Sequence, residues 1–190
     1  MKTTELIKKT PWDSKVFGFN TYEITSLSED VLEAIGKLQG HFTVRVDPLA
    51  SKKILHDNGF YYCDTLIEPF CTPEKFIAWK HPSAGTSRTV VEKDLIAIAH
   101  GAFRHGRFHR DFQIKRELAD LRYEVWLRDL YASGNVLGLM YDGVLAGFFG
   151  LDGNRIVLNA ISGGYRGKGL AKYLWSAACA ELLDSSDGEI

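Results

Sequence analysis

The stretch Arg166-Gly167-Lys168-Gly169-Leu170-Ala171 decides how this chain is interpreted. An apolar run, 156–161, precedes it and a run with helical periodicity, 170–183, follows it, so we predict a strand, a glycine-rich turn and a helix. A helix start carries unpaired backbone N–H groups and the positive end of the helix dipole. Glycines let an anion approach the backbone closely, and Arg166 and Lys168 add positive charge. The stretch therefore predicts a cradle for a pyrophosphate group.

The spacing of the glycines narrows the kind of pyrophosphate site. No Gly-Lys-Ser/Thr follows four free positions, so the stretch is not a P-loop. Nor do its glycines form the G-x-G-x-x-G of dinucleotide-binding domains. Arg166-x-x-Gly169-x-Ala171 fits the pattern Gln/Arg-x-x-Gly-x-Gly/Ala instead. Together with a hairpin predicted over 136–151, the segment 137–183 resembles the acetyl-CoA-binding core of the GNAT N-acetyltransferase superfamily.

The resemblance implies a fold, a cosubstrate and a reaction. A GNAT domain is a mixed, mostly antiparallel sheet flanked by helices, and it transfers an acetyl group from acetyl-CoA directly to an amine. Free backbone groups at the end of the strand before the turn hold the pantetheine in such domains, which makes the N–H of Ile161 our candidate for the catalytic oxyanion contact. The residues that the resemblance assigns to the cosubstrate are Ala160, Ile161, Arg166, Gly167, Lys168, Gly169, Leu170, Ala171 and Lys172.

Composition and charge argue against several other classes of protein. With 190 residues, 45% of them hydrophobic, the chain is long enough for one or two packed domains. Its net charge of −1 gives no general attraction to nucleic acid or to an anionic membrane, and no apolar run approaches the length of a membrane span. The three cysteines, Cys63, Cys71 and Cys179, have no spacing typical of a disulfide framework or a zinc site, so we expect a reducing cytoplasm.

The order of the predicted elements indicates an α/β (α+β) protein. We expect an N-terminal α/β half-domain over 1–80, a linker at 81–87 and the GNAT acetyl-CoA-binding domain over 88–190, because the stretch 81–87 is rich in turn-forming residues. Asp142-Gly143 is a strong signal for a two-residue hairpin. Helices are predicted over 29–38, 51–56, 92–103, 114–131 (with Leu121 facing inward) and 170–183, and strands over 41–46, 60–69, 89–91, 136–141, 144–151 and 156–161.

Two aromatic clusters extend the resemblance over most of the chain. Pro11-Trp12-Asp13-Ser14-Lys15-Val16-Phe17-Gly18-Phe19 lies near the start, and Arg107-Phe108-His109-Arg110-Asp111 lies between two predicted helices. Both are similar to segments of the dTDP-fucosamine acetyltransferase-like branch, which implies a small-molecule amine as substrate and favours an amino sugar on a nucleotide carrier. His109 either acts on that substrate, orienting it or taking its proton, or is an exposed residue of a loop that Phe108 packs down.

The sequence leaves the catalytic groups and the class of function open. His109 and Glu124 are both candidates for the general base, and water can serve as a relay. Glycines separate His100, His105 and His109, so no shared helix face and no metal site are expected. A non-catalytic CoA-binding module would need the same cradle without an acid, a base or an amine pocket. An acetyltransferase that acts on a protein or peptide amine is the second alternative.

The end of the chain predicts an incomplete domain. After 170–183 the sequence Asp184-Ser185-Ser186-Asp187-Gly188-Glu189-Ile190 reads as a turn and the opening of a further strand. A GNAT domain continues with that strand and with a helix that supplies an Asn for the cofactor and a Tyr that protonates the thiolate. We therefore expect an open sheet edge, through which the chain either forms a homodimer or, remaining unpaired, binds CoA weakly. Slow turnover is expected as well, because the usual acid is missing.

Overall fold

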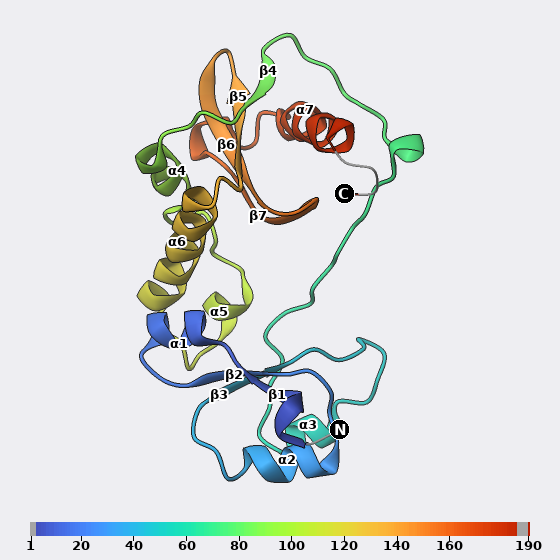
Figure 1. Cartoon of the computed structure of the whole chain (residues 1–190), viewed down its shortest axis with the longest axis vertical. Helices are drawn as coiled ribbons and strands as arrows, with labels where there is room; N and C mark the ends of the chain where they lie inside the picture. The colour runs from blue at the N-terminus through green and yellow to red at the C-terminus, as the bar shows by residue number, and fades with distance from the viewer. Residues whose placement is uncertain (1–2, 186–189) are drawn as a thin grey trace. The chain divides into compact units, whose positions relative to one another are not determined.

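The structure is a computed structural model, and it describes residues 3–185 and 190 of the chain (Figure 1). The chain divides into two compact units. Unit 1 comprises Met1–Thr65 and Arg107–Arg122, and unit 2 comprises Leu66–Gly106 and Tyr123–Ile190. Each unit combines helices with a sheet of its own, which confirms the predicted mixed α+β class.

Unit 1 is built on a three-stranded sheet. Its elements are a 3-10 helix (Thr3–Leu6), β1 (Ile7–Lys9), α1 (Pro11–Phe17), β2 (Thr21–Ile24), α2 (Glu29–Ile35), β3 (His41–Val44), α3 (Lys53–Asp57), α5 (Arg107–Arg110) and the first part of α6 (Arg116–Ala132). The strand order is β1-β2-β3, with β1 antiparallel and β3 parallel to β2. Val31, Leu32 and Ile35 of α2 form a small core with Ile24 of β2, so one apolar helix face covers this sheet.

Local signals explain where two of these helices begin and end. Proline occupies the first position of α1, where its missing N–H costs nothing, and Gly18 ends the helix with a left-handed φ of 78°. Ser28 caps α2, since its hydroxyl accepts a hydrogen bond from the N–H of Val31 at 3.3 Å.

The aromatic cluster near the start of the chain has a packing role in unit 1. Asp13 is buried and forms a salt bridge with Arg122 of α6. Ser14 Oγ accepts a hydrogen bond from the N–H of Thr21 at 3.0 Å. The ring of Phe17 meets that of Phe108 edge to face, with centroids 5.0 Å apart. The two aromatic clusters singled out in the sequence therefore pack against one another within unit 1.

Unit 2 is built on a four-stranded antiparallel sheet. Its elements are a 3-10 helix (Pro73–Lys75), β4 (Ala84–Ser87), α4 (Glu92–Ala99), the second part of α6, β5 (Val136–Tyr141), β6 (Val144–Asp152), β7 (Arg155–Ile161), a 3-10 helix (Gly163–Tyr165) and α7 (Ala171–Asp184). The strand order is β4-β5-β6-β7. The predicted hairpin between β5 and β6 is confirmed, with positive φ at Asp142 and Gly143 as a tight two-residue turn requires.

Helices cover both faces of the unit 2 sheet (Figure 1). Phe148 of β6 packs into a core with α4 and α6, which contribute Leu95 and Leu127. The next residue, Phe149, faces the other side and packs with Leu174 of α7. This alternation is the period of two that a strand between two layers needs.

Some predicted elements are wrong. The strand expected at 60–69 is irregular chain, and 89–91 is not a strand. Ala84–Ser87, expected within the linker at 81–87, form β4, because pairing with β5 overrides a composition typical of loops. The compact units also divide the chain differently from the expected boundary, since 66–80 belongs to unit 2 and 107–122 to unit 1. The further strand expected after Asp184 falls on residues 186–189, outside the described residues.

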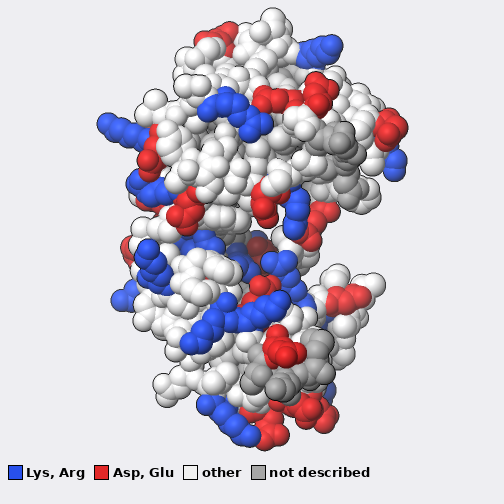
Figure 2. Space-filling view, viewed as in Figure 1, with Lys and Arg blue, Asp and Glu red and all other residues white. Residues whose placement is uncertain are grey.

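The distribution of charge and the hydropathy of the helices are both ordinary for a chain of this composition. Lys and Arg side chains are interspersed with Asp and Glu over the face shown in Figure 2, in keeping with the net charge of −1. Within residues 3–185, we find no helix with the length and apolar character that crossing a bilayer demands.

Candidate functional site

Strand β7 ends at Ile161 on the outer edge of the unit 2 sheet. The N–H of Ser162 donates to Ala146 O at 2.8 Å, and Ile161 lies opposite Gly147. Hydrogen-bonded and non-hydrogen-bonded pairs alternate along an antiparallel ladder, so Ile161 and Gly147 form a non-hydrogen-bonded pair. The N–H and C=O of Ile161 therefore point away from β6, towards an edge that none of the described strands covers. This edge presents the N–H predicted above to be an oxyanion contact.

Ala160 is placed differently from Ile161. The same alternation makes Ala160 and Phe148 a hydrogen-bonded pair, so the backbone groups of Ala160 face β6. Its side chain is buried in the core beneath α4 and α6. The strand end predicted to hold the pantetheine runs from Asn159 to Ile161, and the geometry favours Ile161 and Asn159 over Ala160, because the backbone groups of both face the edge that none of the described strands covers.

Two glycines shape the exposed turn between β7 and α7. Gly167 and Gly169 have φ values of 73° and 71°, in the left-handed region that residues with a side chain rarely adopt. A Cβ placed on either glycine would meet no heavy atom within 4 Å, so the space beside each is open. The glycines thus allow both the path of the chain and a close approach to its backbone.

Helix α7 begins at Ala171, directly after this turn and one residue later than predicted. Its N-cap residue, Leu170, makes no side-chain cap hydrogen bond. The N–H groups of Tyr173 and Leu174 both bond to Leu170 O, and the amides before them have no acceptor within the helix. The first turn of α7 therefore presents backbone donors and the positive end of the helix dipole beside Gly169.

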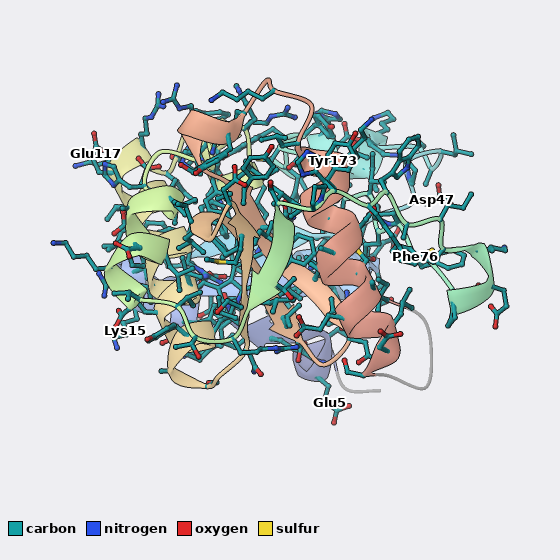
Figure 3. The ribbon with its side chains drawn as sticks, turned by 90° about the horizontal axis from the view of Figure 1, so that it is seen from above. Glu5, Lys15, Asp47, Phe76, Glu117 and Tyr173 are labelled. Atoms are coloured by element: carbon teal, nitrogen blue, oxygen red, sulfur yellow. The ribbon has the colours of Figure 1, made fainter. Side chains whose placement is uncertain are left out.

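Cationic side chains flank this helix start. Arg166 Nε donates to Ile161 O at 2.6 Å, which ties the turn to the end of β7. Lys168 Nζ lies 5.9 Å from the centroid of the Tyr165 ring. Lys172 Nζ lies 4.5 Å from the ring centroid of Trp79 and 4.9 Å from that of Tyr173, which stands at the end of α7 where the chain enters the helix (Figure 3). Backbone donors and three cations close to one another are the features that a candidate anion site requires.

An aromatic cluster that sequence reasoning missed lies at the same end of the sheet. The ring of His81 is 5.1 Å from Tyr173 and 5.3 Å from Tyr141, the last residue of β5, and Tyr141 is 6.0 Å from Tyr165. The N–H of Ser83 donates to His81 Nδ1 at 3.1 Å, which leaves Nε2 as the protonated nitrogen of the neutral ring. These residues come from four separate segments, so no local spacing signals the cluster.

His109 lies inside unit 1. Residues 107–110 form the short helix α5 and not a loop, and the side chain of His109 is only 2% exposed. Its Nε2 lies 3.0 Å from Asp120 Oδ1. The alternative in which His109 is exposed is therefore wrong. The catalytic role predicted for His109 stays a prediction, although burial of the ring favours a structural one.

We expect His109→Gln to change stability more than chemistry. The substitution weakens the contact with Asp120 and alters a buried site, which typically lowers the free energy of unfolding by about 1–3 kcal/mol. If the ring does not touch substrate, kcat of the folded variant stays within about threefold of wild type, far from the hundredfold loss typical of a missing general base. Thermal unfolding and a pH–rate profile check both statements. A kcat loss of that larger size, with loss of one limb of the profile, would assign His109 to catalysis.

A buried carboxylate organises the polar interior of unit 1. Asp111, 4% exposed, accepts hydrogen bonds from Tyr61 Oη and the N–H of Gln113, and its other oxygen lies 2.6 Å from His41 Nε2. Burial tends to raise the pKa of Asp111, but the hydrogen bonds from His41, Tyr61 and Gln113 outweigh it and lower the pKa overall. Local spacing could not reveal the pair, because His41 and Asp111 lie 70 positions apart.

Two of the three free cysteines, Cys63 and Cys179, have raised thiol pKa values. Burial raises the pKa of the Cys179 thiol to about 11, and burial together with Asp111 raises that of Cys63. A thiol must ionise to attack an acyl group, so neither is prepared to carry an acetyl group at neutral pH.

Comparisons with known proteins do not identify a family. No protein-family model matches the chain, and no curated protein matches it.

Proposed function

We propose that this protein is a GNAT-type N-acetyltransferase that moves an acetyl group from acetyl-CoA to the primary amine of a small molecule. The observation that carries the proposal is the start of α7, whose uncapped backbone donors follow two left-handed glycines with open space beside them. The same segment follows β7, whose last amide faces an edge that none of the described strands covers. An elongated ligand with a diphosphate and a peptide-like arm fits both features. The sequence resemblance supplies the chemical class of that ligand.

The residues of unit 2 suit two of the tasks of acetyl transfer. Backbone amides of the 166–172 segment and the cations Arg166, Lys168 and Lys172 would hold the pyrophosphate of acetyl-CoA. The N–H of Ile161 would donate to the thioester oxygen as negative charge develops there. By the same argument, Asn159 would pair with the amides of the pantetheine arm.

For proton transfer we propose a set of candidate groups, not a single residue. The amine must be neutral to attack, and the leaving thiolate must gain a proton. The aromatic cluster near the start of α7 offers four proton donors, and one of them is proposed to protonate the thiolate. They are the hydroxyl groups of Tyr141, Tyr165 and Tyr173 and the Nε2–H of His81. Transfer is proposed to be direct, as the resemblance implies, and the raised pKa values of the Cys63 and Cys179 thiols disfavour an acetyl-enzyme intermediate on either of them.

A nucleotide-linked amino sugar is the proposed acceptor, on the strength of the two aromatic clusters in unit 1 that resemble the sugar-acetylating branch. The proposed compartment is the cytoplasm, which suits free thiols at all three cysteines.

Two alternatives to this proposal remain. A non-catalytic CoA-binding module is the alternative from another class of function, and a protein or peptide amine is the alternative acceptor.

We expect free CoA thiol to be released only when an amine accompanies acetyl-CoA. The measurement is a thiol-release screen of the full chain with nucleotide-linked amino sugars, polyamines, aminoglycosides and peptides. Reaction with amino sugars alone supports the proposed acceptor, and reaction with peptides alone refutes it. Tight binding of acetyl-CoA with no thiol released by any amine favours the non-catalytic module.

A further inference from the structure

An ammonium group at the start of α7 lies beside two aromatic rings. Lys172 Nζ is 4.5 Å from the centroid of the Trp79 ring and 4.9 Å from that of Tyr173. The negative face of an aromatic ring attracts a cation at this range. Trp79 comes from the irregular segment before β4, whereas Lys172 and Tyr173 belong to the first turn of α7.

The position of Trp79 is fixed by its backbone as well as by its ring. The N–H of Trp79 donates to Ser176 Oγ at 3.0 Å, and Ser176 lies one turn after Lys172 on the same face of α7. Trp79 as a residue is 55% exposed, so the contact with α7 leaves much of its surface open to solvent. Substitution of the indole therefore leaves the backbone anchor of this segment in place.

Lysine is an unfavourable residue at this place in a helix. Lys172 is the second residue of α7, where the helix dipole repels positive charge, and its first turn carries no acidic residue. Burial does not explain the lysine, because it is exposed. The two rings offset part of the repulsion, and an anion at the helix start would offset the rest. The arrangement thus fits a site in which the cation awaits an anionic ligand.

We propose that Trp79 and Tyr173 are positioning residues for the anion site, which hold the ammonium of Lys172 beside the first turn of α7 so that it meets the diphosphate of the ligand. The inference rests on the proposed function. Without the rings, the lysine side chain would sample many conformations and would have to be ordered by the ligand itself, which weakens binding. Neither aromatic residue needs to touch the diphosphate.

The test is a double-mutant cycle on the full chain, with inorganic pyrophosphate and acetyl-CoA as the probes in calorimetry. Lys172→Ala is expected to raise Kd about tenfold and Trp79→Ala about two- to fivefold. The double variant should bind no more weakly than Lys172→Ala, because the indole acts only through the lysine. Trp79→Phe should restore most of the affinity. Ile77→Ala, which truncates another exposed apolar side chain of the same segment, serves as the matched control and should bind like wild type.

The dependence of Kd on ionic strength distinguishes a positioning role of Trp79 from a packing role. Trp79→Ala and Lys172→Ala should both flatten the dependence of Kd on ionic strength, whereas a packing defect would lower the melting temperature and leave that dependence unchanged. Additive losses in the cycle, or a wild-type salt dependence in Trp79→Ala, would overturn the inference and leave the proposed function standing. Failure of the wild-type chain to bind either probe would overturn both.

Discussion

Gly169→Glu is expected to abolish binding of acetyl-CoA, with at least a hundredfold rise in Kd, which is about 3 kcal/mol of binding free energy. The space beside Gly169 is open, so the new side chain would enter the volume that the pyrophosphate is proposed to occupy. Its carboxylate would also repel the diphosphate and compete for the amides of α7. Calorimetry with acetyl-CoA measures the affinity, and an unchanged Kd would remove the basis of the cosubstrate assignment.

Gly134→Glu is the matched control for this change. Gly134 has the same φ of 71°, belongs to the same unit and likewise has no heavy atom within 4 Å of the position that a Cβ would take. Both variants therefore carry a similar backbone cost, of order 1–2 kcal/mol, and a similar added charge. The control should melt like Gly169→Glu and still be stabilised by acetyl-CoA, whereas Gly169→Glu should show no such stabilisation. Equal loss of binding in both would attribute the effect to stability.

Asp111→Ala is expected to cause the largest loss of stability, about 3 kcal/mol in unit 1 at neutral pH. The change removes the acceptor of hydrogen bonds from Tyr61 and Gln113 and the partner of His41. Because the pKa of Asp111 is lowered in the folded chain, its charge contributes stability above the unfolded-state pKa, about 3.9. That contribution is lost as the pH falls through the folded-state pKa, so the difference between wild type and variant should shrink below about pH 4.

Asp64→Ala is the control for a generic loss of an ion pair in unit 1. Asp64 pairs with Arg110 at 3.3 Å, and both side chains are well exposed, so the cost should stay within about 0.5 kcal/mol. Thermal unfolding and hydrogen exchange at the β2 amides measure both variants. If Asp111→Ala and Asp64→Ala behave alike, the buried carboxylate does not organise unit 1.

The elements of unit 2 could be predicted from the sequence better than those of unit 1, because most of the patterns that define them lie within a few neighbouring residues. Periodic apolar runs and the Asp142-Gly143 turn are local, and they correctly indicated β5, β6, β7 and α7. Strand β4 has small and polar residues, so its identity depends on β5, which is distant in sequence. Along α6, Leu121 was expected to face inward, yet it is exposed while Arg122 is buried against Asp13, a partner 109 positions away. Periodicity alone cannot reveal such a pair.

The candidate site shows the same limit. The glycine-rich turn and the following helix are contiguous, so residues 166–172 could be named from the sequence. The orientation of the Ile161 amide follows from strand register, which required the pairing with β6. The contact between Trp79 and Lys172 could not be predicted, because the two residues lie 93 positions apart and no local pattern around Trp79 indicates a contact with the start of a helix.

Strand β6 has a consequence for how this chain can vary. Its neighbours Phe148 and Phe149 belong to two different cores, one with α4 and α6 and the other with α7. A volume change at Phe148 can be compensated only from the α4 and α6 side, and one at Phe149, which contacts Trp175 edge to face, only from α7. Substitutions in the core beneath α7 and in the core beneath α4 and α6 can therefore accumulate independently. The α7 side, which carries the candidate anion site, can change towards a new ligand while the core of α4 and α6 keeps the sheet folded.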